Sequence, residues 1–293
     1  MASFDLIVQQ IQRASGHPFA HYTSSPISGG GINDAYQLKT TTQSYFVKLN
    51  TPQREFMFKA EAQGLADLAA TECICVPDVI CYGKTAEHSY LVLEFIACQA
   101  FDRKSSQLLG EQLAQLHQLE QPYFGWHTDN TIGSTLQYNP PEHNWLLFWQ
   151  QHRLQQQLTF AKQNGYAQTL QDKGDQLTEQ LSVFFKGYFP KPALLHGDLW
   201  SGNAAADQQG NPIIYDPACY YGDREADIAM TELFGGFSPD FYAAYQASYP
   251  LDTAYQTRKT LYNLYHILNH VNLFGGSYVD QASNMIGQLL AET

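Results

Sequence analysis

One stretch of the sequence constrains the fold more than any other, a short polar motif set between apolar runs. Residues 194–203 read LLHGDLWSGN, and residues 213–217 read IIYDP. The apolar residues that open each run predict two short buried strands flanking a loop. We expect such a hairpin to bring Asp198, Asn203 and Asp216 to one place, although Asp198 precedes Asn203 by five residues and Asp216 by eighteen.

Two carboxylates and one amide at this spacing are typical of phosphoryl transfer. Asp198 is suited to accept the proton of an attacking hydroxyl, whereas Asn203 and Asp216 are suited to hold magnesium ions that bridge nucleotide phosphates. Each residue also has a structural alternative, because Asp198 can cap a turn and Asn203 can occupy a left-handed turn beside Gly202. The upstream features described below favour the catalytic alternative.

Composition narrows the possible partners. The 293-residue chain has a net charge of −12 at pH 7, which argues against a nucleic-acid partner because such partners bind basic surfaces. The sequence opens without a signal-peptide pattern and has no apolar run of membrane-spanning length. Its five cysteines form no disulfide pattern. We therefore expect a cytoplasmic protein with neither a nucleic-acid nor a membrane partner.

A run of three glycines, Gly29, Gly30 and Gly31, lies between two expected strands. Glycines let a backbone approach bulky groups closely, and phosphates are the usual occupant of such a loop. The run matches neither a Walker loop nor a Rossmann turn, and a flexible tight turn is an equal alternative.

Two charged residues lie where apolar ones are expected. Lys48 interrupts an apolar strand at 45–49, and Glu61 falls on the apolar face of a helix expected over 54–70. An unpaired charge in either place is costly, so we expect the two to pair. A strand lysine paired with a helix glutamate anchors the ATP phosphates in protein kinases. The alternative is that both side chains reach solvent.

A change from strand-like to helix-like composition indicates two lobes. The apolar run at 90–96 predicts a buried strand, and helical periodicity follows it. We place the connection between the lobes at 94–98. The expected division is an N-terminal lobe over 1–96 and a C-terminal lobe over 97–293.

Three acidic residues follow the second motif. Asp223 and Glu225 are expected to cap the start of a helix, and contact with an amine-bearing substrate is their alternative. Asp227 lies inside that helix beside apolar neighbours, and a hydrogen bond back to the catalytic loop would explain it. Trp200 is a candidate for stacking on a sugar, with ordinary packing as its alternative.

Two absences point away from protein kinases. Position 197 is glycine, where protein kinases carry the arginine of H-R-D, and only ten residues separate Asp216 from Asp227. No long phosphorylatable loop fits between them. We therefore expect a kinase that acts on small molecules or small adducts.

The chain resembles the fructosamine kinase (ketosamine-3-kinase) family, relatives of the aminoglycoside and choline kinases. The resemblance runs essentially end to end and rests on LLHGDLWSGN, IIYDPA, the glycine loop, FVK at 46–48, FGWH at 124–127 and LFGGF at 233–237. It implies an α+β, bilobal protein-kinase-like fold. The smaller lobe would hold an antiparallel sheet and one key helix, and the larger lobe would be mostly helical.

The resemblance also implies an activity. It is the ATP-dependent phosphorylation of the sugar 3-hydroxyl of ketosamines (fructosamine, ribulosamine or psicosamine), with Mg²⁺ as cofactor and Asp198 as proton acceptor. Adenine contacts would come from the backbone of Glu94, Phe95 and Ile96. The acceptor is a small ketosamine or a glycated lysine of a protein, and the sequence does not indicate an oligomeric state. The alternatives are a kinase for an aminoglycoside, choline or homoserine, and a non-catalytic nucleotide-binding module.

Overall fold

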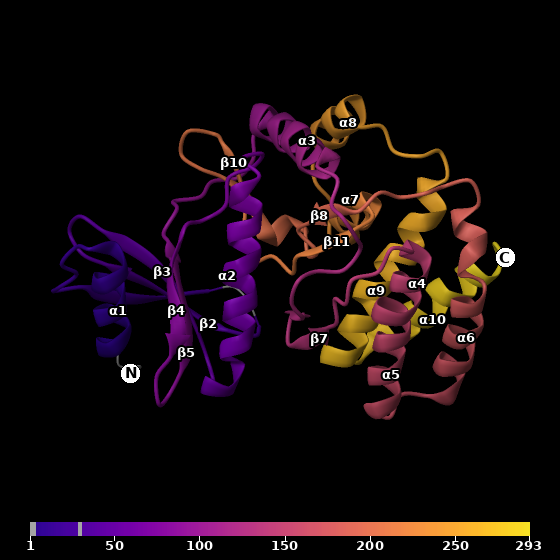
Figure 1. Ribbon diagram of the computed structural model, residues 1–293, viewed down its shortest axis with the longest axis horizontal. Coiled ribbons are helices and arrows are strands. Elements are labelled where there is room, and N and C mark those ends of the chain that lie inside the picture. Colours follow the sequence, from indigo (N-terminus) through magenta and orange to yellow (C-terminus); the bar gives the residue numbers. More distant parts are fainter. Residues whose placement is uncertain (1–3, 29–30) are drawn as a thin grey trace.

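The structure is a computed structural model that describes residues 4–28 and 31–293. It has two lobes, a small one built on a β-sheet and a larger, mostly helical one (Figure 1). The fold class is therefore the one that the sequence predicts. Gly29 and Gly30 of the expected phosphate loop lie outside the described residues.

The small lobe holds one antiparallel sheet of five strands in the order β1-β2-β3-β5-β4. Two helices pack on it, one on each face. The elements are α1 (Asp5–Ser15), β1 (Thr23–Ile27), β2 (Asp34–Lys39), β3 (Ser44–Asn50), the 3₁₀ turn η1 (Pro52–Arg54), α2 (Glu55–Ala70), β4 (Val79–Lys84) and β5 (Ser89–Glu94).

Alternation along β3 decides which side chains face which helix. Val47 and Leu49 belong to a buried cluster with Ile7 and Ile11 of α1. Successive side chains of a strand point to opposite faces, so Lys48 lies on the face that α2 covers. The buried lysine is therefore directed toward α2 and the larger lobe.

The larger lobe follows an extended segment after β5. Its elements are α3 (Arg103–Gln118), β6 (Asn130–Ile132), β7 (Thr135–Gln137), α4 (Trp145–Trp149), the π-helical turn η2 (Gln150–Leu154), α5 (Gln155–Gln163), α6 (Gln168–Glu179), η3 (Leu181–Phe185), β8 (Ala193–Leu195), η4 (Ser201–Asn203), β9 (Ala204–Ala206), β10 (Pro212–Ile214), β11 (Tyr220–Gly222), α7 (Arg224–Leu233), α8 (Pro239–Ser248), α9 (Tyr255–Phe274) and α10 (Ser277–Leu290). We propose the boundary between the lobes at residues 96 and 97, within that extended segment.

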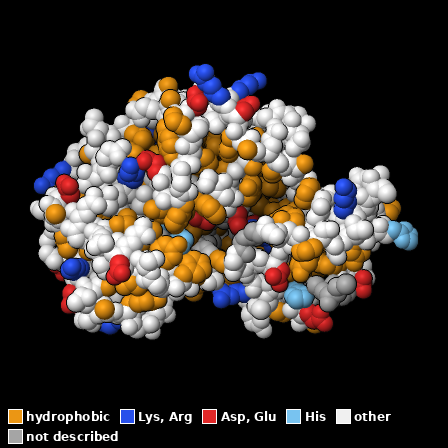
Figure 2. Space-filling model, turned by 180° about the vertical axis from the view of Figure 1, so that it is seen from behind, with side chains coloured by type: hydrophobic (Ala, Val, Ile, Leu, Met, Phe, Trp, Pro, Cys, Tyr) orange, Lys and Arg blue, Asp and Glu red, His pale blue; other side chains and the backbone are white. Residues whose placement is uncertain are grey.

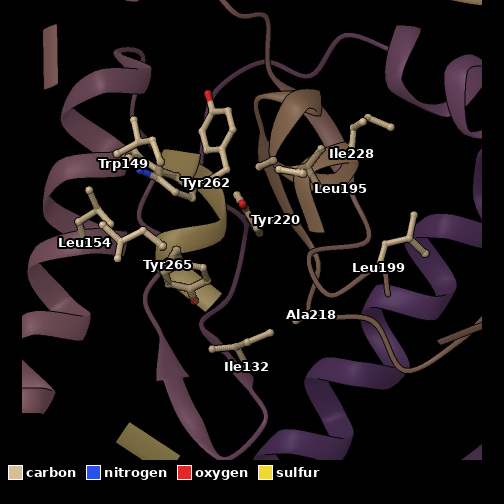
Figure 3. Packing of buried hydrophobic residues seen from close by; sticks show 14 of the residues in the cluster. Ile132, Trp149, Leu154, Leu195, Leu199, Ala218, Tyr220, Ile228, Tyr262 and Tyr265 are labelled. Carbon is tan, nitrogen blue, oxygen red and sulfur yellow. The ribbon is translucent and has the colours of Figure 1, made fainter. Parts of the chain in front are cut away.

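A continuous apolar core lies directly beneath the predicted catalytic loop, residues 196–203. Leu195, which precedes the loop, and Leu199, which lies within it, are fully buried and join the same cluster as Ala218 and the rings of Tyr262 and Tyr265 (Figure 3). The part of the loop that carries Asp198 is thus anchored on both sides in close-packed side chains, which resist displacement.

The strand pairing in this region differs from the predicted hairpin. β8 pairs with β11, and β9 pairs with β10, so the two apolar runs belong to separate two-stranded ladders. A further hairpin, β6–β7, lies between α3 and α4. Strands of three residues are too short for their periodicity to specify a partner.

None of the helices in the described part of the chain combines the length and the apolar character that a bilayer crossing requires.

Candidate active site

A network of three charged side chains joins the two lobes. The Nζ atom of Lys48 lies 2.7 Å from Oε1 of Glu61 on α2 and 2.6 Å from Oδ1 of Asp216, which follows β10. The side chains of Lys48 and Glu61 are about nine-tenths buried, whereas that of Asp216 is 51% exposed. The predicted pairing of the lysine with the helix glutamate is present, and Asp216 approaches from the other lobe.

The ion pair keeps Lys48 charged. Burial by itself would lower the pKa of this lysine, but the carboxylates of Asp216 and Glu61 raise it above its ordinary value. Burial acts to raise the pKa of Asp216, and the charge of Lys48 outweighs it, so that the pKa lies below its ordinary value. Asp216 is therefore a carboxylate, ready to bind a cation.

Asp198 and Asn203 are held together on the catalytic loop. The Nδ2 atom of Asn203 donates to the backbone oxygen of Asp198 at 2.9 Å and to its Oδ2 at 3.2 Å. Burial, followed by the charge of Asp216, raises the pKa of Asp198 well above its ordinary value. A raised pKa makes this carboxylate a stronger proton acceptor than an exposed one.

Gly197 allows the catalytic loop to approach the segment that follows Asp216. Its φ of 81° is in the left-handed region, and a Cβ at this position would lie 2.1 Å from the backbone oxygen of Ala218. No other residue type fits without moving one of the two loops. The close contact with Ala218 therefore explains why position 197 holds glycine and not the arginine of H-R-D.

His196 connects the same two loops through its ring. Its Nε2 lies 3.0 Å from the carbonyl oxygen of Tyr215 and must therefore donate, which leaves Nδ1 to accept the N–H of Asp198 at 3.3 Å. Burial lowers the pKa of this histidine, consistent with a neutral ring. The sequence placed His196 in the motif but assigned it no function.

Asp227 supports the catalytic loop from below, as expected. Its Oδ2 accepts the N–H of His196 at 2.7 Å and its Oδ1 accepts the N–H of Gly197 at 2.8 Å. His117 of α3 lies 3.4 Å from Oδ2. The charged form is favoured by these donors, and the pKa of Asp227 lies below its ordinary value despite burial.

A second support was not predicted. The side-chain amides of Asn130 and Gln137, on the β6–β7 hairpin, donate to the carbonyl oxygens of Cys219 and Ala218 at 2.8 and 3.1 Å. These bonds fix the segment that follows Asp216. Single amide residues in a polar stretch carry no sequence signal for such a role.

The donor set fits Mg²⁺, a hard cation that prefers oxygen ligands. Asp216 offers a carboxylate, and the amide oxygen of Asn203 receives no hydrogen bond within the described residues. The part of the chain that the structure describes contains no cluster of three or more His, Cys, Asp or Glu side chains suited to a metal. Two protein ligands are sufficient where nucleotide phosphates complete the coordination.

The expected adenine segment follows the end of β5. The N–H of Glu94 already donates to the backbone oxygen of Asp78 at 2.8 Å, so any adenine contact from the backbone of Glu94 would use its carbonyl group. Phe95 and Ile96 begin the extended segment between the lobes. Gly31 is the described member of the glycine loop, and no atom of the other described residues, its chain neighbours aside, would lie within 4 Å of a Cβ at this position.

Trp200 lies at the surface beside Asp198 and is 38% exposed. Its ring rests against Gly202, where a Cβ would lie 2.3 Å from the indole carbons. The position leaves one part of the ring open to a ligand. Figure 2 shows acidic side chains in the hollow between the lobes, with hydrophobic side chains gathered along the larger lobe.

Asp223 and Glu225 are not available to a substrate, which corrects the alternative considered for them. Both are buried, and Asp223 caps α7 while it accepts hydrogen bonds from Tyr188 and Tyr262. Glu225 binds Arg258 through both carboxylate oxygens, at 2.7 and 3.1 Å. The capping interpretation is the one that the structure supports for Asp223.

Comparison with known proteins agrees with this geometry. A family model described as fructosamine kinase matches residues 3–292. A probable ketoamine kinase of Synechocystis sp. is 48% identical over 290 residues, covering 99% of this chain and 97% of that protein. A chloroplastic protein-ribulosamine 3-kinase of Arabidopsis thaliana is 40% identical over 267 residues, covering 90% of this chain and 81% of the relative.

Solved structures agree as well. A structure described as a fructosamine-3-kinase from Haemophilus somnus superimposes with a TM-score of 0.89 at 33% identity, covering 97% of this chain and 96% of that one. The choline kinase LicA of Streptococcus pneumoniae shares the fold at 16% identity, with a TM-score of 0.65 and 99% of each chain covered.

The fold and the site define a phosphotransferase with an alcohol group as acceptor, in which a lysine–glutamate pair and a loop with aspartate and asparagine face each other between two lobes. The family model matches nearly the whole length of the chain, and this match identifies the family. This chain belongs to the fructosamine kinase family.

Proposed function

We propose that the protein is a Mg²⁺-dependent kinase that transfers phosphate from ATP to the sugar 3-hydroxyl of ketosamines, free or attached to a lysine, in the cytoplasm. The observation that carries the proposal is the convergence of Lys48, Asp216, Asn203 and Asp198 from both lobes. Relatives described as ketoamine kinase and protein-ribulosamine 3-kinase support this class of acceptor.

Each protein group has a defined task in this reaction. Lys48, oriented by Glu61, binds the α- and β-phosphates, which take the place of its present contact with Asp216. Asp198 orients the acceptor hydroxyl and accepts its proton as the phosphate is transferred. Mg²⁺ held by Asn203 and Asp216 would supply charge neutralisation at the phosphates. Positioning and electrostatics account for most of the rate, because the transition state of phosphoryl transfer is loose.

The backbone of the segment at Glu94, Phe95 and Ile96 is assigned to adenine, and the loop at Gly29, Gly30 and Gly31 to the phosphates. Both assignments follow from the kinase-like arrangement and are part of the proposal.

A phosphorylation screen tests the proposal. The purified protein is supplied with ATP, Mg²⁺ and fructosyl-, ribulosyl- or psicosyl-lysine, and the phosphate on the product is located by ¹H–³¹P correlation. We expect ATP consumption that depends on these acceptors and a phosphate on the 3-hydroxyl. Faster turnover of choline, homoserine or an aminoglycoside in direct competition, or phosphate on another hydroxyl, contradicts it.

A further inference from the structure

A row of aromatic rings continues from the catalytic loop across the larger lobe. We call it the aromatic stripe, and it consists of Trp200, Phe234, His270, Phe274 and Tyr278. The ring centroids of Trp200 and Phe234 are 6.4 Å apart, and those of Phe234 and His270 are 5.0 Å apart. His270 lies 5.5 Å from Phe274 and 4.9 Å from Tyr278. Rings from four separate segments therefore form one surface that starts two residues from Asp198.

The stripe is open to solvent. Phe274 is 61% exposed and Trp200 is 38% exposed, while the rings between them are partly exposed. Single exposed apolar residues are common, but a contiguous exposed group beside a reactive site is typical of a ligand surface. Phe189, which is 87% exposed and appears in no ring contact among the described residues, is an example of the first kind.

Few positive side chains come from the part of the chain that carries the stripe. Residues 199–293 contain only three Lys and Arg, which are Arg224, Arg258 and Lys259. Arg258 and Lys259 are paired with carboxylates, and Arg224 is buried against the backbone oxygens of Tyr249 and Pro250. A cationic ligand meets no uncompensated positive side chain from this part of the chain.

The histidine in the stripe adds a hydrogen-bond acceptor. The Nδ1 atom of His270 lies 2.8 Å from the carbonyl oxygen of His266 and therefore donates to it. Nε2 is then the acceptor nitrogen of the neutral ring, and it has no hydrogen-bond partner within the described residues. Burial lowers the pKa of His270, which keeps the stripe uncharged near pH 7.

We propose that the aromatic stripe binds the amine-bearing part of the ketosamine: the protonated amine over the rings nearest Asp198 and the amine's hydrocarbon substituent along the rings beyond. The proposal rests on the proposed function, which brings the reacting sugar hydroxyl to Asp198. The amine of a ketosamine is attached close to that hydroxyl, so its substituent must leave the site along a neighbouring surface. Aromatic faces attract cations and bury hydrocarbon, and the stripe offers these two interactions one after the other along its length.

This assignment predicts a substrate class. Ketosamines of amines with a long or aromatic hydrocarbon substituent should be preferred over unsubstituted fructosamine. Fructosyl-glycine should be a poor substrate, because its carboxylate lies next to the amine and would meet the negative faces of the aromatic rings.

The test is a ratio of specificity constants. For wild type and Phe274→Ala, kcat/KM is measured with ε-fructosyl-lysine and with unsubstituted fructosamine. We expect the ratio of the first to the second to fall about five- to twentyfold in the variant, through KM, because the deleted ring contacts only the substituent. Phe189→Ala removes an equally large exposed ring away from the stripe and should keep the wild-type ratio.

Three outcomes overturn the proposal. The same ratio in Phe274→Ala as in wild type would show that the substituent lies elsewhere. Equal KM values for an N-benzyl ketosamine and its uncharged O-benzyl ether would show that the protonated amine does not bind over the rings. If wild type phosphorylates no ketosamine at all, the proposed function fails together with the stripe, whereas turnover with an unchanged ratio leaves the function intact and rejects only the stripe.

Discussion

Two groups of acidic side chains close together in the sequence have opposite surroundings. Asp198 and Asp216 face the cleft, where Asp216 is paired only with Lys48 and Asp198 only with the amide of Asn203 among the described side chains. Asp223 and Glu225 are buried beneath the same region, and protein donors satisfy them from several directions. The difference shows that burial of an acid does not by itself mark a reactive group. A buried acid that many protein donors satisfy has a structural role, whereas an acid with few donors keeps oxygen atoms free for a ligand.

The largest effect is expected in the cleft. Asp198→Asn keeps the size of the side chain but removes the proton acceptor, so turnover should fall on the order of 10²–10⁴-fold. ATP affinity should be nearly unchanged, because Lys48 and Asp216 remain. The measurement is kcat together with nucleotide binding by calorimetry. Undiminished turnover would remove Asp198 from its assigned role.

Substitution of a buried acid should lower the stability of the protein and leave its activity largely unchanged. Glu225→Gln removes the buried, bidentate partner of Arg258 and leaves the guanidinium only the carboxylate of Asp252, so the free energy of unfolding should fall by about 3 kcal/mol. Urea denaturation measures the change. Asp240→Asn is the matched control, because its ion pair with Arg103 is solvent-exposed and should contribute less than about 1 kcal/mol. A large rise in the KM of the ketosamine with little loss of stability would instead place Glu225 at the substrate.

Asp227 belongs to both regions, since it is buried and yet supports the catalytic loop. Asp227→Asn directs an amide group at one of the two backbone N–H groups that it accepts now, and should cost about 2 kcal/mol of stability. The loop should also shift, lowering kcat on the order of tenfold to a hundredfold. Stability and kcat should therefore fall together. A fall in stability alone would give Asp227 a purely structural role, and a fall in kcat alone would give it a role only in positioning the catalytic loop.

The smallest effect is a pH dependence beneath the site. Burial lowers the pKa of His266 to about 3, with a further lowering from His270 and Arg153 and an opposing contribution from Asp227. Below pH 6.5 the unfolded chain takes up a proton that the folded chain does not, so stability falls as the pH is lowered.

The slope attributable to His266 is at most about 1.4 kcal/mol per pH unit. His266→Gln should make the unfolding free energy less dependent on pH between 6.5 and 4.5, as measured by urea denaturation at several pH values. His17→Gln, at an exposed position, should keep the wild-type slope. Identical slopes in all three proteins would contradict the assignment.

Charge on an apolar face was the most informative signal in the sequence. The positions of Lys48 and Glu61 predicted their contact, and the position of Asp227 inside a helix predicted its bond to the catalytic loop. In each case burial of an ionised group is so costly that a partner could be inferred before any coordinates.

Other features had no such signal. The three-residue strands around the motif pair by tertiary packing, and their partners could not be read from periodicity. The amide donors Asn130 and Gln137 are neutral, so their burial requires no obvious counterpart in the sequence. For Asp223 and Glu225 the substrate alternative stayed open because the donors that satisfy them, Tyr262 and Arg258, lie on a distant helix.

The absence of a side chain at position 197 has a consequence for control of the enzyme. Protein kinases commonly use an arginine there to sense a phosphate added to a flexible segment, which makes their output depend on another enzyme. Here the backbone oxygen of Ala218 fills that space. The ring of His196 donates to the carbonyl oxygen of Tyr215, and the N–H of Ala218 donates to the carbonyl oxygen of His196, so that hydrogen bonds hold the two loops in contact. The contact between these two loops therefore needs no phosphate on another segment to complete it.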